Sequence, residues 1–415
     1  MTFWYIHEKF YDLSKFESHP GGINILHSCS STKDQLKDAT QMFESYHGLV
    51  DKKKVIIMMD EYVIKEEDYD KYEITKNIIE QTKVFKIYDF TNYNIFVDKI
   101  KSKIIYSHKA NIYWLIKVVL MLMIYFKTYK YAIYDGNKSI IISMVSGMIY
   151  GMISFVIMYD ASHNALTQNP KIDQLISKIW NSFGLWNHNI WMLQYCQTQY
   201  SFTDEYGKDF NYVHDGSFIR KDEKVPLRKN QLLTNHFFML LVPCMYFGQI
   251  LLYLTSVIRN RSWKFEMINL VDNLTIYERI LYLLSIYNMI TCKSYSNVVI
   301  YFVSLNLIYC LCIIPDHDTY ENLTVPINPN DWMEQQIIKS GNFCNGNIIM
   351  TQLCGGINYQ IERHLFPSTC HIHYPIISKY VKEYCEQNNI KYVRHKSYLD
   401  ALESYFRSLI YVSSE

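Results

Sequence analysis

The sequence predicts a mainly α-helical membrane protein that crosses the bilayer about four times and carries a small α+β unit at its N-terminal end. Three long runs of the 415-residue chain contain no Asp, Glu, Lys or Arg, and each is long enough to span a hydrocarbon layer about 30 Å thick. Hydrophobic residues make up 49% of the chain, which gives ample apolar surface to bury. Residues 1–75 are instead charged and mixed, which indicates a separate unit.

The uncharged runs define three spans, and a weaker fourth is interrupted by lysines whose long side chains can reach the membrane surface. Soluble helices average about 11–12 residues, so a buried soluble helix is the poorer interpretation of runs this long. Gly147 and Gly151 form a GxxxG pair, which predicts ordinary close packing between helices. The predicted spans are Asn111–Tyr134, Ser139–Tyr159, Leu232–Ile258 and Ser294–Pro315.

A further apolar stretch, Ile280–Cys292, is short and is closed by Lys293, which favours an interfacial or re-entrant helix over a crossing. With four crossings, residues 1–109, 160–231 and 316–415 share one face of the membrane. Nearly all the histidines lie in these segments. Any site that joins them must therefore be assembled on that face.

Charge and cysteine content exclude other classes of protein. Lys and Arg number 41 against 40 Asp and Glu, and this balance gives no basic surface for nucleic acid. The ten cysteines are scattered without metal-type CxxC pairs, and residues 1–19 lack the apolar stretch of a secretory signal peptide. We therefore expect reduced cysteines that face the cytosol.

Two histidines in the N-terminal unit are candidate haem ligands. His19 opens a His-Pro-Gly-Gly corner, where Pro fixes φ and the glycines permit close backbone approach. The amphipathic stretch "DATQMFESYHG" is predicted to be a helix that ends at His47. Two histidines on separate elements around an apolar slot can supply both axial ligands of a haem. The alternative is a corner histidine in a domain that no longer takes up haem.

The corner "HPGG", the "DAT..F" helix and its closing histidine resemble the cytochrome b5 domain. The resemblance implies that His19 and His47 are the axial ligands of haem b. The interval between these histidines is longer than is usual in the family, with "SCSSTKDQLK" inserted. On this basis we predict a cytochrome b5-like haem-binding domain over 1–75, a linker and pre-membrane segment over 76–108, and a membrane domain over 109–415.

The membrane domain resembles the front-end fatty acyl desaturases, which carry a fused cytochrome b5 domain. The motifs that match in order are "DHDT" (Asp316–Thr319), "DWMEQQ" (Asp331–Gln336), "GGINYQIERHLFP" (Gly355–Pro367) and "HYP" (His373–Pro375). The resemblance implies a long acyl chain as substrate and two non-haem irons, held by histidine boxes, that activate dioxygen and remove hydrogen from the chain. Imidazole nitrogens suit iron, and two histidines four residues apart on a helix face one metal.

The boxes depart from the family pattern of H-x-x-x-H, then a lone His shortly before H-H, then Q-x-x-H-H. Of the seven box histidines, His163 and His364 remain. Arg363 replaces a third-box histidine, and a guanidinium has no lone pair to donate. The other changed positions are Tyr159 in the first box and, in the second box, Tyr195 or Cys196 with Gln199 and Tyr200.

The residual metal-ligand candidates are His163, His317, Gln360 and His364. Too few ligands remain for the family's two irons, so we expect the non-haem di-iron centre to be absent. A rebuilt site is the alternative, because other histidines share the same face and Tyr or Cys can also ligate iron. Its candidate residues are His188, His214, His371, His373, Tyr159, Tyr195, Cys196 and Tyr200, with Asp160 and Glu362 beside the boxes as groups that orient ligands.

The sequence thus predicts a desaturase-like protein of lipid metabolism whose desaturation is weak or absent, a pseudoenzyme in a membrane of the endoplasmic reticulum type with both termini cytosolic. The expected partners are membrane lipids or acyl chains, cytochrome b5 reductase or an active desaturase, and not nucleic acid. Two alternatives stay open. One is a membrane-anchored b5-type electron-transfer protein, and the other is an active acyl-lipid oxidase or desaturase with an altered metal site.

Overall fold

The structure, a computed structural model, describes most of the chain and places the candidate site where three parts of it meet. It describes residues 2–414 apart from 17–18, 34–35, 84, 104–107, 137–138, 202, 205–208, 210–219, 222–224, 229–230, 232–262, 266–267 and 271–274. The predicted span Leu232–Ile258 and the candidate ligand His214 lie outside the described residues.

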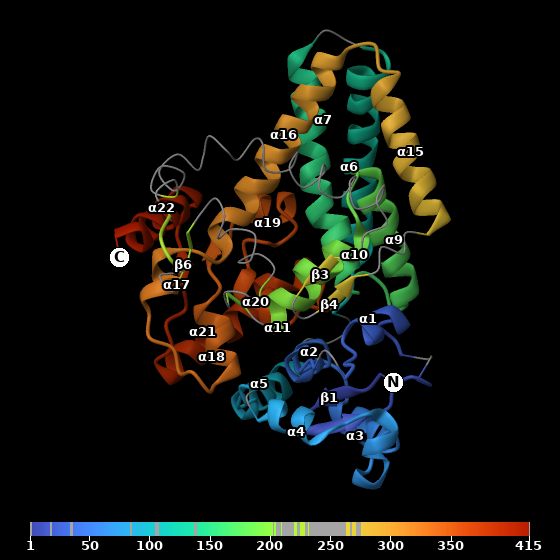
Figure 1. Cartoon of the computed structure of the whole chain (residues 1–415). Helices are drawn as coiled ribbons and strands as arrows, with labels where there is room; N and C mark the ends of the chain where they lie inside the picture. Colours follow the sequence, from blue (N-terminus) through green and yellow to red (C-terminus); the bar gives the residue numbers. More distant parts are fainter. Residues whose placement is uncertain are drawn as a thin grey trace.

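Three helical segments confirm three of the four predicted spans. Each is long and apolar enough to cross a membrane: Ile112–Tyr134, Ile140–Ser162 and Tyr295–Thr324. They pack together as the upper bundle of Figure 1. Their parts are α6 (Ile112–Tyr129), the π-helical η2 (Lys130–Tyr134), α7 (Ile140–Ile153), the π-helical η3 (Ser154–Tyr159), α8 (Asp160–Ser162), α16 (Tyr295–Ile313), the 3-10 turn η5 (Ile314–Asp316) and α17 (Tyr320–Thr324).

The glycine pair explains why α7 and α16 pack so closely. A Cβ placed on Gly147 would collide with the carbonyl oxygen of Tyr301, and one on Gly151 would lie 3.3 Å from the carbonyl oxygen of Leu305. The backbone of α16 therefore occupies the space that side chains would need. This confirms the predicted role of the GxxxG pair in helix packing.

The short apolar segment differs from its prediction. It forms α15 (Ile276–Ile290), which begins at Ile276 rather than Ile280 because Thr275 and Glu278 make a reciprocal capping box. Figure 1 shows α15 standing beside the spans, with its last turn next to the start of α16. It packs on α9 (Pro170–Phe183) and against η2. Among the described residues, α15 is not one of the helices long and apolar enough to cross a membrane, and its assignment as an interfacial or re-entrant helix stays a prediction.

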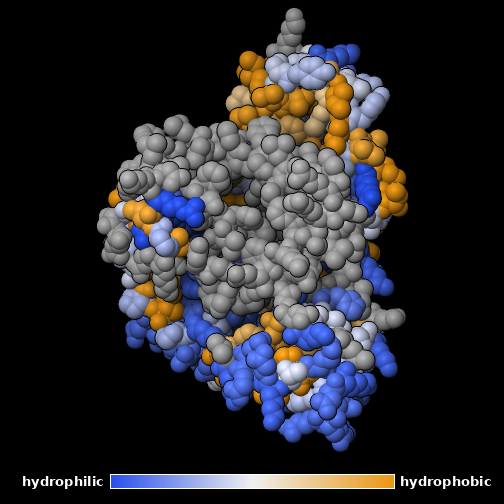
Figure 2. All heavy atoms as spheres, viewed as in Figure 1, coloured by the Kyte–Doolittle hydropathy of each residue, from blue (hydrophilic) through white to orange (hydrophobic). Residues whose placement is uncertain are grey.

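The surface of the bundle is the kind that lipid covers. Side chains on all three spans and on α15 are largely exposed although they are apolar, among them Met123, Ile141, Leu283 and Val299. Figure 2 shows hydrophobic residues gathered over the bundle and hydrophilic residues over the opposite end of the molecule. Exposed apolar surface of this extent marks a membrane-facing region.

The N-terminal residues form a small α+β unit with cores of its own. β1 (Trp4–Ile6) pairs antiparallel with β2 (Lys9–Tyr11), and two clusters of buried apolar side chains lie within residues 3–85. His19 lies in the turn before α1, and His47 ends α2, so the predicted corner and helix are confirmed. The helices are α1 (Ile23–Ser28), α2 (Thr40–Tyr46), α3 (Lys52–Asp60), η1 (Glu66–Tyr72) and α4 (Lys76–Thr82).

The remaining helices close the lower part of the molecule around the site. α5 (Thr91–Lys101) shares an apolar core with three C-terminal elements, and the last two helices of the chain also pack on this part. The elements are α10 (His188–Trp191), η4 (Met192–Thr198), α11 (Gln199–Ser201), β3 (Trp263–Phe265), β4 (Ile268–Leu270), α18 (Trp332–Ile338), β5 (Asn342–Phe343), α19 (Ile348–Leu353), α20 (Gln360–Leu365), η6 (His371–His373), α21 (Tyr374–Asn388), β6 (Arg394–His395) and α22 (Tyr398–Ser414).

Candidate functional site: a remodelled metal centre

Three segments carry the box positions into one buried region. Two of them are π-helical: η3 leads to Tyr159, and η4 carries Tyr195 and Cys196. The third is α20, in which every residue is buried. π-Helical turns are rare and occur often at functional sites, because the extra residue in the turn redirects side chains. The backbone around the box positions therefore has a feature that is common at functional sites.

The first box keeps one imidazole, which now lies among aromatic rings. The ring of His163 stacks on Tyr159 at 4.9 Å between centroids, as expected for residues four apart on a helix. Its Nδ1 lies 2.8 Å from the hydroxyl of Tyr46, and its Nε2 lies 3.7 Å from Sγ of Cys196. Burial, and then the nearby guanidinium of Arg363, hold the pKa of His163 well below its usual range. His163 is therefore neutral.

Arg363 fills the centre of the region with a permanent positive charge. Its guanidinium carbon lies 4.0 Å from the ring centroid of Tyr159 and 5.4 Å from that of Tyr374, which are cation–π distances. It donates to the carbonyl oxygen of Gly355 at 2.6 Å and lies 3.8 Å from Oδ1 of Asp160. Only 1% of Arg363 is exposed. This charge stands where the resemblance calls for a metal ligand, so the residues present do not fit a pair of irons.

Two other imidazoles of the region, those of His317 and His364, bring their Nε2 atoms close together. Nδ1 of His317 donates to the carbonyl oxygen of Lys339 at 3.0 Å, and Nδ1 of His364 donates to Oε1 of Gln336 at 2.8 Å. Each Nε2 therefore carries a lone pair, and the two Nε2 atoms lie 3.2 Å apart. Two imidazole nitrogens that share one metal at about 2.0–2.1 Å lie roughly 2.9–3.4 Å apart.

Two glutamine amides complete this pair. The side-chain nitrogens of Gln199 and Gln360 lie 2.8 and 2.9 Å from Nε2 of His317. Among the described residues, the amide oxygens of both glutamines are buried without a hydrogen-bond partner. Rotation of either amide would turn its oxygen toward the same point. These four side chains could hold one cation, and the two imidazoles alone have the spacing of shared ligands.

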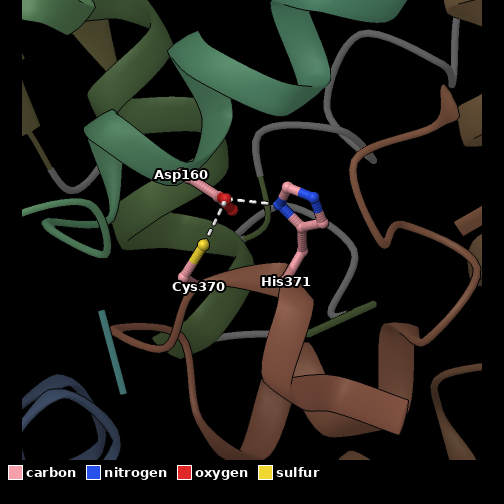
Figure 3. A group of neighbouring side chains, drawn as sticks. All are labelled: Asp160, Cys370 and His371. Carbon is pink, nitrogen blue, oxygen red and sulfur yellow. Dashed lines mark hydrogen bonds and ion pairs between the residues drawn. The ribbon is translucent and has the colours of Figure 1, made fainter. Parts of the chain in front are cut away.

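Asp160, Cys370 and His371 form a second group of side chains (Figure 3), and Arg363 lies 3.8 Å from Oδ1 of Asp160. Oδ2 of Asp160 accepts from Nδ1 of His371 at 2.5 Å and from Sγ of Cys370 at 3.3 Å. The three side chains are close enough to hold a metal. However, Nε2 of His371 already accepts from the Lys117 ammonium at 2.8 Å. Both nitrogens of His371 are used and a cation is already beside it, so the cluster serves to balance the buried charge of Arg363.

The two candidate haem ligands face each other in the N-terminal unit. The rings of His19 and His47 lie 6.1 Å apart between centroids. Nδ1 of His47 donates to the carbonyl oxygen of Phe43 at 2.8 Å, which leaves Nε2 with a lone pair. Burial lowers the pKa of His19 and takes that of His47 to about 4, so both imidazoles are neutral near pH 7.

Tyr46 joins this unit to the box region. It precedes His47 in the chain, and its hydroxyl donates to the carbonyl oxygen of Cys196 at 3.1 Å while it lies 2.8 Å from Nδ1 of His163. Gly48, directly after His47, lets the hydroxyl of Tyr93 on α5 approach the chain at a point where a Cβ would collide with it. The candidate haem ligand His47 is thus the sequence neighbour of Tyr46, which is hydrogen-bonded to the box histidine His163.

Comparison with protein families matches residues 139–396 to the family described as Fatty acid desaturase. The chain belongs to the fatty acid desaturase family. Its members act on lipid acyl chains in membranes, and the family as a whole uses a non-haem di-iron centre. The resemblance found in the motifs is therefore confirmed for the membrane domain.

Curated relatives of this desaturase-family chain have low sequence identity to it, but the similarity extends over most of their length. It is 24% identical to the sn-1 linoleoyl-lipid 6-desaturase of Synechocystis sp. over 64% of this chain and 78% of the relative. It is 21% identical to the acyl-lipid (8-3)-desaturase B of Dictyostelium discoideum over 97% of this chain and 89% of the relative. It is 22% identical to an acyl-lipid (8-3)-desaturase of Physcomitrium patens over 97% of this chain and 86% of the relative.

Within this desaturase-family fold, the residual box residues do not form one site. His317, Gln360 and His364 lie together, but the ring of Tyr200 lies between His163 and His364, at 5.2 and 4.7 Å from them. The sequence did not indicate that Gln199 would join the first three. Its only signal was its position in the second box, where it replaces a histidine.

The other proposed substitutes have structural partners. His188 bonds to Ser177 and Gln174, and Nε2 of His373 bonds to the carbonyl oxygen of Lys109. Burial raises the pKa of the Cys196 thiol to about 12 and that of the Tyr200 phenol well above its usual range, so both stay protonated. Tyr195 packs on Trp191 at 4.1 Å. Glu362 accepts from Asn342 and Tyr392, each at 2.8 Å.

Proposed function

We propose that this protein is a desaturase-family membrane protein of lipid metabolism whose oxygen-dependent desaturation is weak or absent. The observation that carries the proposal is the buried guanidinium of Arg363, which lies over Tyr159 and beside Asp160. A cation without lone pairs would repel a metal and cannot ligate it. The phenols and thiol around it stay protonated, so they do not replace the lost imidazoles.

The N-terminal unit is proposed to be a cytochrome b5-like domain that binds haem b through His19 and His47. Two imidazoles on opposite sides of one iron, each at about 2 Å, have ring centroids about 6 Å apart. The observed 6.1 Å supports this assignment, as do the neutral state of both rings and the hydrogen bond that fixes the tautomer of His47. Haem bound there would supply one-electron transfer.

The proposed setting is a four-span protein in a membrane of the endoplasmic reticulum type, with both termini cytosolic. The three observed spans, together with the segment Leu232–Ile258, support that count. Cytochrome b5 reductase would reduce the haem domain, and an active desaturase or another lipid oxidase would receive its electrons. The protein would associate with membrane lipids or acyl chains.

A specific observation favours a second candidate function, an acyl-lipid oxidase with an altered metal site. His317 and His364 present two Nε2 atoms 3.2 Å apart, next to the amides of Gln199 and Gln360. This arrangement offers nitrogen ligands for one metal rather than two. The Arg363 charge next to it would weaken binding of a divalent cation, which is why we place this candidate second.

The deciding experiment is to purify the whole protein in detergent and to measure haem by absorbance and iron by elemental analysis. We expect one haem and no further iron per chain. Haem should be lost in His47→Ala and retained in the control His27→Ala, because His27 is exposed. Two non-haem irons per chain would overturn the proposal, and one iron that is lost in His364→Ala would favour the second candidate.

Expression in a desaturase-deficient host, followed by fatty acid profiling, tests catalysis directly. The proposed function predicts no new double bond. A new double bond that is present in the wild type and absent in His364→Ala would establish the oxidase instead.

A further inference from the structure

A basic cleft outside the box region carries an inference about lipid binding. The cleft has a volume of about 290 Å³ and lies between α19, α21 and β6. Lys379, Lys382 and Arg394 line it, and its lining residues include no Asp or Glu. Lys379 and Lys382 are three residues apart on α21, so their side chains share one face of that helix.

The cations of the cleft are available to an anion. Among the described residues, Lys379 has no acidic partner within ion-pair distance. Lys382 lies 3.6 Å from Glu386, but both side chains are more than half exposed, and such pairs contribute little. Arg394 uses one nitrogen to donate to the carbonyl oxygen of Asn345 at 3.2 Å, which holds its guanidinium at the cleft. Its other donors remain for a ligand.

The turn at one wall of the cleft holds an unpaired polar side chain. Asn345 lines the cleft, and both polar atoms of its side-chain amide are buried without a hydrogen-bond partner among the described residues. Buried amides of this kind normally have partners. The turn that holds it is constrained, because Cys344 and Gly346 on either side have φ of 52° and 91°. The hydroxyl of Tyr359 accepts from the backbone N–H of Gly346 at 2.9 Å and fixes this turn.

A hydrogen bond links the cleft to the first span. Gln352 lines it, and its Oε1 accepts at 2.7 Å from Lys117 in the first span. Its rim is apolar: Ile348 and Ile349 on α19 are 75% and 72% exposed, and Ile376 at the start of α21 is 51% exposed. Exposed apolar side chains next to lysines are the arrangement that inserts into a lipid interface.

We propose that this cleft binds the phosphate of a membrane phospholipid. Lys379, Lys382 and Arg394 take the anionic oxygens. Ile348, Ile349 and Ile376 take the glycerol and the first methylenes of the chains. The site deepens the proposed function, because it names a phosphate-bearing headgroup for the lipid that the protein associates with.

Binding to the full-length protein in nonionic detergent tests the site. The probe is fluorescent phosphatidic acid, measured by anisotropy, with unlabelled phosphatidic acid, diacylglycerol and inorganic phosphate as competitors. Unlabelled phosphatidic acid should compete, and diacylglycerol should not. One lysine near an anionic lipid surface is worth about fivefold in affinity. The double variant Lys379→Gln/Lys382→Gln should therefore weaken binding by at least about fivefold.

The matched control is Lys391→Gln/Lys396→Gln, which removes the same charge from exposed positions that do not line the cleft. It should change the affinity less than twofold. An equal loss in both double variants would mean binding to general surface charge and would overturn the site. Displacement by inorganic phosphate as effective as that by the lipid would overturn the lipid assignment. The assay needs neither haem nor iron nor turnover, so its failure would leave the proposed function intact.

Discussion

Arg363 is a buried cation at a box position, and a carboxylate lies beside it. The metals of the family's centre are cations too, so the guanidinium places the same sign of charge in this region. It pairs with Asp160 at 3.8 Å and lies over the ring of Tyr159. The region therefore holds a buried positive charge next to a carboxylate. Removal of one partner alone would leave a buried charge unpaired.

The first prediction tests this pairing by a double-mutant cycle. Arg363→Met and Asp160→Asn should each destabilise the protein, by about 3–5 kcal/mol if the pair behaves as other buried ion pairs do. The double variant should be less destabilised than the sum of the two, with a coupling of at least about 1 kcal/mol. Thermal unfolding in detergent measures this. Additive losses would show that the two side chains do not interact.

The second prediction concerns pH. Burial lowers the pKa of His188 to about 3, so its folded pKa lies below the value of about 6.5 in the unfolded chain. Its contribution to stability is then present above pH 6.5 and is lost as the pH falls toward 3. Between pH 6.5 and 5 the wild type should lose about 2 kcal/mol more than His188→Gln. The pH dependence of the melting temperature checks this, and the exposed His27→Gln should match the wild type.

The residues of the candidate site could be predicted only where a sequence motif marked them. The positions of His163, His317, Gln360 and His364 came from the pattern, and the structure brings the last three together. Tyr46 could not be found in this way. Its contact with His163 joins residues 117 positions apart, and it depends on how the N-terminal unit docks. Gln199 was counted as a lost ligand because it replaces a histidine of the second box. The sequence does not show that its amide lies 2.8 Å from Nε2 of His317.

At the scale of elements, hydropathy predicted the spans because a bilayer requires long uncharged helices. The same criterion misplaced the start of α15. Glu278 and Arg279 end the apolar run, but Glu278 caps the helix and is buried there. The charged residue Glu278 thus lies inside the first turn of the helix and caps it, whereas the hydropathy criterion placed it before the helix. The π-helical turns η3 and η4 had no sequence signal that periodicity could detect.

The third prediction concerns the contact between α7 and α16. Gly147→Ala should force the two helices apart, because the new Cβ would meet the backbone of Tyr301. Overpacking of this kind costs typically about 1–3 kcal/mol. Gly151→Ala, whose Cβ would meet its nearest neighbours at 3.3 Å, should cost less. Unfolding in detergent would rank the two variants, and the reverse order would contradict the packing described here.

At the scale of the whole molecule, one end of the protein is apolar and the other is hydrophilic (Figure 2). The N-terminal unit docks at the hydrophilic end through Tyr46 and through Lys52, whose ammonium donates to Asn94 on α5 at 2.6 Å. The composition of residues 1–75 indicated a separate unit, but composition carries no information on docking. The surface that meets lipid follows from which apolar side chains remain exposed after folding.

The fourth prediction tests that surface by labelling in intact membranes. Ile141 on α7 is 71% exposed and Ile57 on α3 is 69% exposed, so the protein buries them equally little. We expect lipid around Ile141 and water around Ile57. A water-soluble maleimide should modify Ile57→Cys and leave Ile141→Cys unmodified above the wild-type background. Detergent and denaturant should then make both reactive. Equal labelling in intact membranes would contradict the assignment of the spans.

Lys117 sets the depth at which the first span sits. Its ammonium is held by His371 and Gln352, both of which belong to the hydrophilic end. A hydrocarbon layer that begins at this anchor is crossed by residues 118–134, a rise of about 25 Å at about 1.5 Å per residue. A thick, sterol-rich bilayer would therefore have to thin around the protein, whereas a thin one of about 27 Å would accept it with little distortion.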